Sequence, residues 1–384
     1  MKSNYEPLGK HIQLVDYRNS EEVTSTVLGI SIDKEFMPSV ANVIGTDLSR
    51  YKLISKGLFA CNPMHVGRDE RLPIALYEKD NAAIVSPAYF MFEIIDRDVL
   101  NEEYLMMWFR RPEFDRECWF MTDGSVRGGI TWDDLCRIKL PVPSYARQCE
   151  IVESYRAITN RIALKRAEND NLEAAAQAIY KKMFVDDVDS ANLPDGWKII
   201  ALENVAELSA GGDRPAVYSD YPTDVCNVPI FSNGIDKEGL YGFTDKAKVF
   251  EESVTVSARG TVGYVFLREK PYVPIVRLIS VVPNTMHITA KYLLFALSAI
   301  DLHSTGTSQQ QITVPDFKKR LILVPNKQSL DTFMQRITPL FNSIKDNKAE
   351  IESLLSLQAN FLTCLLYTSP SPRDRTRSRM PSSA

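Results

Sequence analysis

The chain has 384 residues, of which 45% are hydrophobic and 24% charged, and its formal net charge is −4. This length excludes a single hydrophobic core, which stops growing at about 250–300 residues, so at least two domains are expected. The acidic balance is not typical of a free DNA-binding domain, so any nucleic-acid binding would need local positive charge or a partner. No apolar run of about 20 residues predicts a membrane span, and residues 1–10 show no charged-then-apolar signal pattern, so we expect a cytoplasmic protein.

Neither the cysteines nor the polar motifs form a catalytic pattern. The six cysteines include no C-x-x-C pair and the four histidines are scattered, which predicts reduced thiols and no metal site. Residues 62–65 (NPMH) lack the second proline and the aromatic residue of an amino-methyltransferase motif. Residues 259–263 (RGTVG) follow an apolar strand but lack the lysine of a phosphate-binding P-loop. We therefore predict that the chain is not an enzyme.

The first half of the chain predicts an α+β domain that is followed by one long helix. After a polar, β-prone start at 5–43, strands are expected within 51–60 and 82–95 and a helix at 102–111. Residues 148–184 contain no Gly or Pro. Their apolar residues recur at alternating steps of four and three, which is the seam of a coiled coil. This helix should pair with another helix.

The second half predicts the same order of elements after a polar linker at 185–192. Strands are expected at 228–231, 253–257 and 275–282, a helix at 290–300 and a second apolar seam at 328–363. Pro339 lies within this last helix, where its ring and missing N–H disfavour a straight helix. Two interpretations stay open: a local kink, or a helix that begins later than its counterpart.

The two halves are copies of one plan, offset by 182 positions. The first four seam residues of the first helix, from Ile151 to Ile162, fall on those of the second, from Phe333 to Ile344. The offset also aligns residues 124–135 with 306–317, and the strand-like runs 137–143 and 319–325, without a gap. Such agreement predicts two repeated α+β domains with mixed sheets, each followed by a long helix, the two helices pairing as an antiparallel coiled coil. The expected divisions are 1–144, 145–186, 187–327, 328–363 and a tail at 364–384 whose Ser, Pro and Arg content resembles a translated adapter sequence.

Polar loops at equivalent places in the two halves are the candidate binding sites. Residues 305–311 (TGTSQQQ) hold three amides and three hydroxyls just before a strand, and residues 124–129 (GSVRGG) occupy the same place in the first half. Glutamine bonds adenine bidentately and arginine bonds guanine, so both loops suit base recognition. Further polar clusters lie near residues 62 and 259. The DNA-binding candidates are Asn62, His65, Arg68, Arg71, Ser125, Arg127, Arg259, Thr261, Thr307, Ser308, Gln309, Gln310 and Gln311.

These features together resemble a known family. A Gly/Ser/Gln loop, an Ile-Thr-x-x-Asp-Leu-type turn, an Ile-x-Leu-Pro-x-Pro strand and a long helix, each present twice, are similar to the specificity subunit of Type I restriction-modification systems. The matching residues of the first copy are Gly124, Ile130, Thr131, Asp134, Leu135, Leu140, Pro141, Val142, Pro143, Gln148 and Ile151. Those of the second are Gly306, Gln309, Gln310, Gln311, Ile312, Thr313, Asp316, Phe317, Val324 and Pro325, with the second proline of the strand missing.

The resemblance implies a role and partners for this chain. Each target-recognition domain would read one half of a bipartite double-stranded DNA sequence, with the paired helices as a spacer. Two modification (methyltransferase) subunits would dock on the chain, joined by restriction subunits. The chain itself would need no cofactor, since S-adenosylmethionine, ATP and Mg would serve the partners. Two alternatives stay open: the recognition chain of a Type II system with a fused methyltransferase-nuclease partner, and a coiled-coil scaffold with no nucleic-acid role.

Overall fold

The computed structural model describes residues 5–39, 45–64, 66–122, 128–186, 188–189, 191–300 and 311–364. It divides into two compact units, which are treated separately below: unit 1 comprises Met1–Arg166 with Ala349–Ala384, and unit 2 comprises Ala167–Lys348. Within the described ranges, no helix is both long and apolar enough to cross a membrane. Residues 365–384 of the predicted tail lie outside these ranges.

The described residues of unit 1 form two four-stranded sheets and one pair of strands. The first sheet has the order β2-β9-β6-β7 with every neighbour antiparallel, and the second has the order β4-β3-β8-β5 with β3 and β8 parallel. The pair joins β1 to β10. The strands are β1 (Tyr5–Pro7), β2 (Ile12–Leu14), β3 (Val27–Ile30), β4 (Phe36–Pro38), β5 (Lys52–Ile54), β6 (Phe59–Cys61), β7 (Ile74–Leu76), β8 (Ala83–Val85), β9 (Phe90–Ile94) and β10 (Lys139–Pro141).

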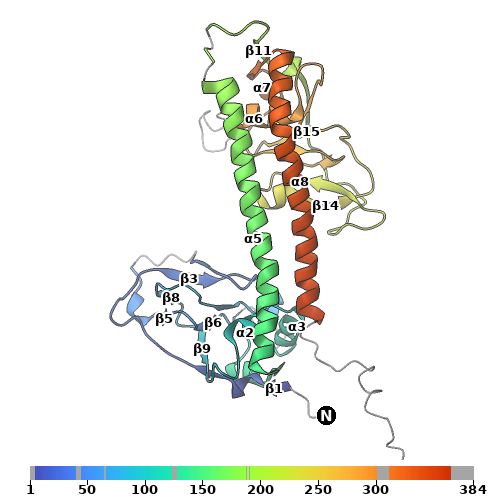
Figure 1. Ribbon diagram of the computed structural model, residues 1–384. Coiled ribbons are helices and arrows are strands. Elements are labelled where there is room, and N and C mark those ends of the chain that lie inside the picture. The colour runs from blue at the N-terminus through green and yellow to red at the C-terminus, as the bar shows by residue number, and fades with distance from the viewer. Residues whose placement is uncertain are drawn as a thin grey trace, which may run out of the picture. The chain divides into compact units, whose positions relative to one another are not determined.

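The helices of unit 1 close its apolar core. Figure 1 shows α2 beside the sheet that contains β6 and β9, where Phe59 stacks on Phe92 at 5.1 Å between ring centroids and Phe109 meets both rings edge-on. Asn101 begins α2, because its side chain accepts from the amides of Glu103 and Tyr104. The helices are α1 (Val66–Asp69), α2 (Glu102–Phe109), α3 (Pro112–Phe120), α4 (Trp132–Arg137) and the first part of α5 (Tyr145–Lys181), with short turns η1 (Leu8–Lys10) and η2 (Leu48–Arg50).

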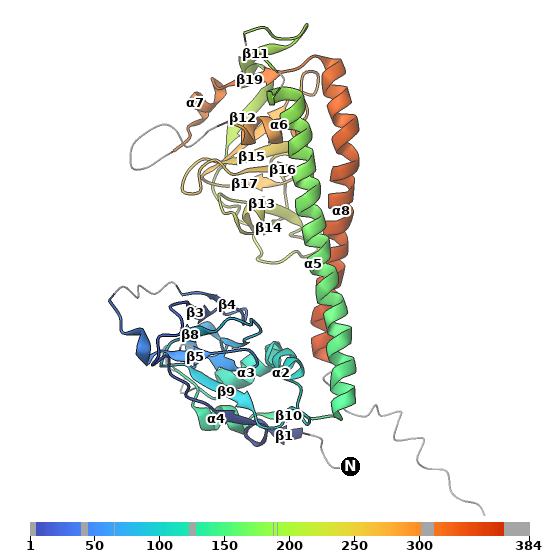
Figure 2. The same cartoon turned by 60° about the vertical axis from the view of Figure 1, so that its left-hand side comes forward.

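Unit 2 repeats this plan with the sheet order β12-β18-β15-β16, a second sheet β14-β13-β17 and the pair β11-β19. Figure 2 shows α6 packed against the first of these sheets. The strands are β11 (Lys198–Ala201), β12 (Ala206–Ala210), β13 (Val228–Phe231), β14 (Leu240–Thr244), β15 (Ser253–Ser257), β16 (Val265–Arg268), β17 (Val273–Pro274), β18 (Leu278–Pro283) and β19 (Leu321–Val324). The helical elements are η3 (Lys182–Asp186), η4 (Leu202–Asn204), η5 (Asp236–Gly239), α6 (Ala290–Ser298), α7 (Val314–Lys318) and α8 (Lys327–Cys364).

Buried contacts recur at equivalent positions of the two units. The phenol of Tyr104 donates to the carbonyl of Pro141 at 3.0 Å, and that of Tyr292 donates to the carbonyl of Leu323 at 2.8 Å. Thr131 and Thr313, 182 positions apart, each begin a helix by accepting a hydrogen bond from the amide three residues on. The tyrosine bonds join α2 to β10 and α6 to β19, and the threonine bonds begin α4 and α7, so the sequence repeat is a repeat of structure.

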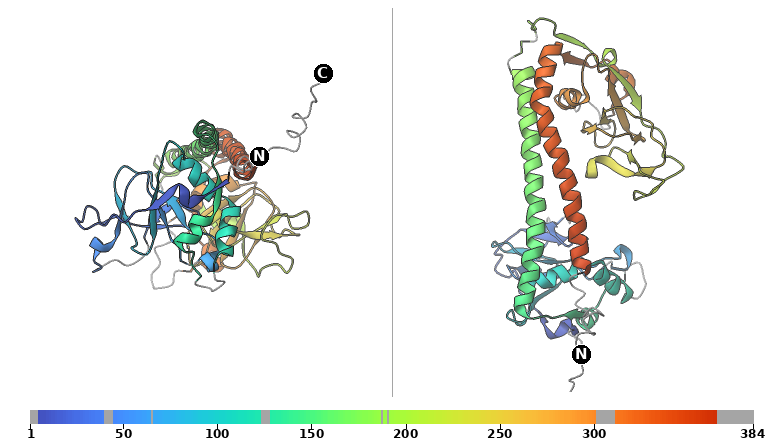
Figure 3. Two further views of the ribbon diagram at one scale, coloured as in Figure 1. Left: turned by 90° about the horizontal axis from the view of Figure 1, so that it is seen from below. Right: turned by 45° about the vertical axis from the view of Figure 1, so that its right-hand side comes forward.

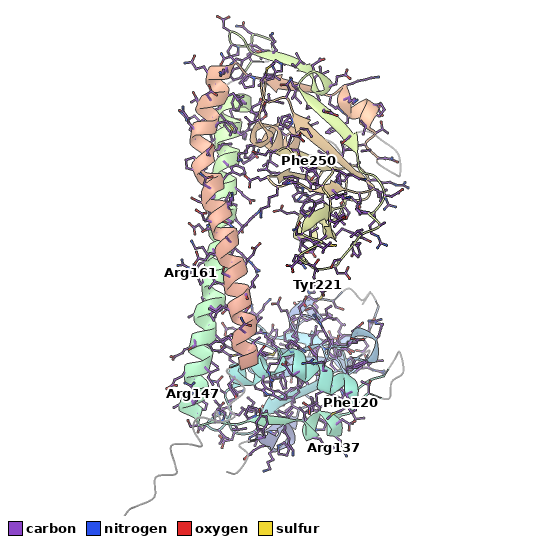
Figure 4. The ribbon with its side chains drawn as sticks, turned by 90° about the vertical axis from the view of Figure 1, so that its right-hand side faces the viewer. Phe120, Arg137, Arg147, Arg161, Tyr221 and Phe250 are labelled. Atoms are coloured by element: carbon purple, nitrogen blue, oxygen red, sulfur yellow. The ribbon has the colours of Figure 1, made fainter. Side chains whose placement is uncertain are left out.

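The long helices α5 and α8 pair antiparallel within each unit (Figure 3). In unit 1, Tyr155 meets Phe361 at 6.1 Å between rings, and Arg161 of α5, labelled in Figure 4, donates to Glu350 at 2.7 Å. In unit 2, Asn169 bonds Asn347 at 2.9 Å, and Phe184, which follows α5, packs on Phe333 at 5.2 Å. In each unit, residues later in the sequence of the first helix thus contact residues earlier in the sequence of the second, as antiparallel pairing requires. The predicted fold class, including the antiparallel coiled coil, is confirmed.

Three local predictions need correction. Helix α8 begins at Lys327 and continues through Pro339, so the interpretation of a later start is wrong. The runs expected at 51–60 and 82–95 each contain two strands, β5 and β6 in the first, where Gly57 turns the chain with a φ of 84°, and β8 and β9 in the second. Helix α3 was not expected, because its short segment mixes four charged with four apolar residues and follows another helix directly. The divisions predicted for the chain differ from the two compact units and stay predictions.

Candidate functional site

The two predicted polar segments of unit 2 meet at one end of its four-stranded sheet. The amide of Ile312 donates to the carbonyl of Ala258 at 2.8 Å, and Arg259 faces Gln311 in an antiparallel bridge. Ala258 follows β15 directly, so the turn at 259–263 and the segment entering α7 share an edge. The structure thus brings Arg259 and Gln311 together, although 52 positions separate them in the sequence.

Two hydrogen bonds to Asn233 fix the turn after β15. The side-chain nitrogen of Asn233 donates to the carbonyl of Arg259 at 2.7 Å, while the hydroxyl of Thr261 donates to the carbonyl of Asn233. Gly260 reverses the chain with a φ of 82°, a conformation that favours glycine. The predicted candidate Thr261 is therefore half-buried and braces the turn, and the guanidinium of Arg259 is left exposed at its tip.

Two arginines near this end of the sheet, Arg214 and Arg277, were not predicted from the sequence. The carbonyl of Arg277, which precedes β18, accepts from the amide of Ala258 at 2.8 Å, so Arg277 adjoins the Arg259 turn. Arg214 follows β12 by four residues, and its guanidinium lies over the ring of Tyr218 at 4.8 Å. Both side chains are exposed. Arg214 follows the turn-prone run Gly211-Gly212-Asp213, whose first amide donates to the carbonyl of Leu278 at 2.7 Å. Arg277 follows no turn motif and no charge run, so only the sheet register reveals that it adjoins the Arg259 turn.

Unit 1 forms the same edge from its own polar segments. The amide of Ile130 donates to the carbonyl of Pro63 at 3.1 Å, and the amide of Gly67 donates to the carbonyl of Gly128 at 2.9 Å. A Cβ at Gly129 would lie 2.9 Å from the carbonyl oxygen of Pro63, so only glycine permits this approach. The loop after β6 and the segment entering α4 thus meet as their counterparts do in unit 2.

The predicted residues of that loop serve different purposes. Asn62 shapes the turn, because its side-chain oxygen accepts from the amide of Met64 at 3.2 Å. Arg68 forms a two-pronged bond with Asp69 at 2.7 and 2.9 Å, and this carboxylate raises the pKa of the guanidinium. Arg71 binds Asp33 at 3.0 Å and lines a cavity that also contains Lys34. The positive charge of the unit 1 loop is therefore compensated locally.

The remaining candidates lie outside the described ranges. They are His65, Ser125, Arg127, Thr307, Ser308, Gln309 and Gln310, and their roles stay predictions. Six of these seven belong to the loops that lead into Gly128 and Gln311. Gly128 and Gln311 are themselves described and lie at the edges of unit 1 and unit 2. Within the part of the chain that the structure describes, no three His, Cys, Asp or Glu side chains gather in a way that could hold a metal ion.

Known proteins share this sequence and this fold. A family model described as Type I restriction modification DNA specificity domain matches residues 194–355. The C-terminal part of a putative type I specificity subunit from Mycoplasma pneumoniae is 38% identical over 122 residues, which cover 30% of this chain and 83% of the relative. A second putative type I specificity subunit of that organism is 30% identical over 146 residues, covering 38% of this chain and 40% of the relative. This chain thus matches less than half the length of that second relative.

A solved structure extends the likeness across both units. The crystal structure of the Type-I restriction-modification system S subunit from M. genitalium covers 93% of this chain and 94% of its own, with a TM-score of 0.54 and 14% identity. At that identity the likeness concerns the fold. The family model and the relatives from Mycoplasma pneumoniae show the family, and the solved structure has the same fold. This chain belongs to the family of Type I restriction-modification DNA specificity subunits.

Proposed function

We propose that this chain is the DNA sequence-recognition subunit of a Type I restriction-modification complex. Each unit would read one half of a bipartite double-stranded DNA target with the loops at its sheet edge. The observation that carries the proposal is the repeated edge, at which Ile130 bonds Pro63 and Ile312 bonds Ala258. A recognition function explains why two divergent domains keep one loop framework while the side chains on it differ, because each half of a target needs different contacts.

The edge of unit 2 has the chemistry that this function requires. Arg259 offers a planar guanidinium that suits either a phosphate or the guanine edge, and Gln311 offers an amide that suits adenine. Hydrogen bonds fix the backbone of both beside the end of β15, because the carbonyl of Arg259 accepts from Asn233 and Ile312, which follows Gln311, donates to Ala258; this limits the freedom lost on binding. The predicted loop residues Thr307, Ser308, Gln309 and Gln310 would complete this surface, as Ser125, Arg127 and His65 would in unit 1.

Catalysis and its cofactors would belong to partner subunits. We propose that two modification subunits dock on the chain and supply S-adenosylmethionine chemistry, and that restriction subunits supply ATP- and Mg-dependent cleavage. Cations of the partners would also contribute to phosphate binding, which offsets the net charge of −4 on this chain. The chain would act by positioning these subunits on one sequence.

The test is a methylation map. The chain would be expressed with the modification subunit of its own system in a host that lacks methylation, and the methylated bases would be located across the genome. We expect one bipartite motif, and we expect a combined Arg259→Ala and Gln311→Ala variant, which keeps the brace of Thr261, to relax or abolish one half of it. If the methylated sequences are the same with and without this chain, the proposal is wrong.

A further inference from the structure

Arg277 has a backbone conformation that its side chain does not favour. It lies in the turn between β17 and β18 with a φ of 73°, in the left-handed region where glycine is the unstrained residue. At two of the five other such positions the side chain has a structural use, because Lys34 forms a buried ion pair with Asp115 and Glu238 binds Lys348. The side chains of the other three, Glu22, Glu70 and Lys237, are exposed, so Arg277 is distinguished by its place at the candidate site. The side chain of Arg277 is exposed and forms no ion pair with any residue the structure describes. A use outside the fold would account for it.

The backbone of Arg277 is fixed to the candidate site. Its carbonyl accepts from the amide of Ala258 at 2.8 Å, and the carbonyl of Ala258 in turn accepts from Ile312 at 2.8 Å. Ser257 at the end of β15 pairs with Leu278 at the start of β18, so the turns at 277 and 259 leave the sheet at the same end. Two arginines are therefore presented side by side from rigid strands.

We propose that Arg277 contacts a DNA phosphate and anchors the recognition edge of unit 2; this inference rests on the proposed function. An arginine offers two parallel N–H groups to phosphate oxygens, and a fixed backbone places that contact at a constant distance from the Arg259 turn. Such a contact carries no sequence information. It would set where the recognition loop meets the bases.

The test compares Arg277→Gly and Arg277→Lys in the full chain bound to its modification subunit. Glycine removes the charge and relieves the left-handed backbone, so the variant should melt no lower than wild type. Its affinity for mixed-sequence double-stranded DNA should fall several-fold. The slope of log affinity against log salt should become shallower by about one, as for the loss of one phosphate contact. Lysine should restore most of the affinity and the slope.

A matched control separates a specific contact from general charge. Lys270 is an exposed cation of the same unit that lies away from the candidate site. It follows the last residue of β16, Arg268, which pairs with Ser253 at the end of β15 opposite the Arg259 turn. Lys270→Ala should leave affinity and slope unchanged. Equal losses for both variants, or an unchanged Arg277→Gly variant, would overturn the proposal. A loss confined to one target sequence that lysine does not restore would also overturn it, in favour of base reading. If wild type binds no DNA, the proposed function itself fails.

Discussion

The amide of Ile312 donates to the carbonyl of Ala258 at 2.8 Å, and the equivalent amide of Ile130 donates to the carbonyl of Pro63 at 3.1 Å. Each bond closes one polar loop onto another at the end of a four-stranded sheet. The two edges differ in charge, since Arg68 is bonded to Asp69 at the first, whereas Arg259 forms no ion pair with the described residues of the second. Equivalent backbone thus supports different electrostatics.

This difference predicts unequal effects of two arginine substitutions. Arg259→Ala should weaken binding of mixed-sequence double-stranded DNA by the full complex and reduce its salt dependence, because an exposed guanidinium displaces counterions. Arg68→Ala should have the smaller effect, because its charge is already neutralised by Asp69. Both variants should keep their stability within about 0.5 kcal/mol, as surface changes do. Titrations at several salt concentrations measure the effect, and a larger loss for Arg68→Ala would contradict the assignment.

The architecture of the chain could be predicted from its sequence, but the contacts that form the two sheet edges could not. The repeat was readable because seam residues and helix starts such as Thr131 and Thr313 keep one offset of 182 positions. The bond between Ile312 and Ala258 was not readable, because the number of residues between its partners differs from that between Ile130 and Pro63. The role of Arg277 could not be predicted for another reason. A positive φ at an arginine has no signal in the sequence, whereas a glycine such as Gly260 predicts a turn.

Asn169 and Asn347 form a polar pair inside the helix seam of unit 2. Both are buried, and the side-chain amide of Asn347 donates to Asn169 at 2.9 Å. Buried asparagines in coiled coils specify register at a cost in stability. Asn169→Leu alone should destabilise the chain by about 1–3 kcal/mol, because it removes an acceptor from a buried donor. The double change to leucine should recover this loss and exceed wild type.

Denaturant unfolding followed by circular dichroism would measure these differences. Asn160→Leu is the control, since Asn160 is exposed on the same helix α5 and its substitution should change stability little. A single Asn169→Leu variant that is more stable than wild type would show that the pair contributes nothing that leucine cannot replace.

Gln148 illustrates how equivalent positions acquire opposite chemistry. Its side chain is fully buried and makes three bonds of 2.9 Å, accepting from the amide of Asn101 and donating to the carbonyls of Val99 and Pro143. The equivalent Leu330 packs in the apolar core of unit 2. Gln148→Leu should therefore cost about 1–3 kcal/mol, since it leaves a buried amide without an acceptor.

The reciprocal change, Leu330→Gln, should also destabilise the chain, because it buries a polar group among apolar neighbours. Thermal melting of the two variants beside wild type tests both expectations. If exchange of the residue types is tolerated at both positions, the hydrogen bonds of Gln148 do not fix the start of α5 in the way that their geometry indicates.

A buried ion pair stabilises the part of unit 1 that carries Arg71. Lys34 donates to Asp115 at 2.6 Å and to the carbonyl of Leu72 at 2.7 Å, and Asp115 accepts from the amide of Leu72 at 3.0 Å. Asp115→Ala should cost about 3–5 kcal/mol, because it leaves a buried charge without its partner. Asp115→Asn should cost less, since its side-chain oxygen still accepts from Leu72.

The buried cysteines of unit 1 report this loss directly. Burial raises the pKa of the Cys61 and Cys118 thiols well above the ordinary value, so neither forms the reactive thiolate near neutral pH while unit 1 is folded. Labelling of these two thiols by a disulfide reagent should therefore be slow in wild type, faster in Asp115→Asn and fastest in Asp115→Ala. The partly exposed Cys149 should react at the same rate in all three proteins. Equal labelling of Cys61 in wild type and Asp115→Ala would show that the ion pair does not hold this core closed.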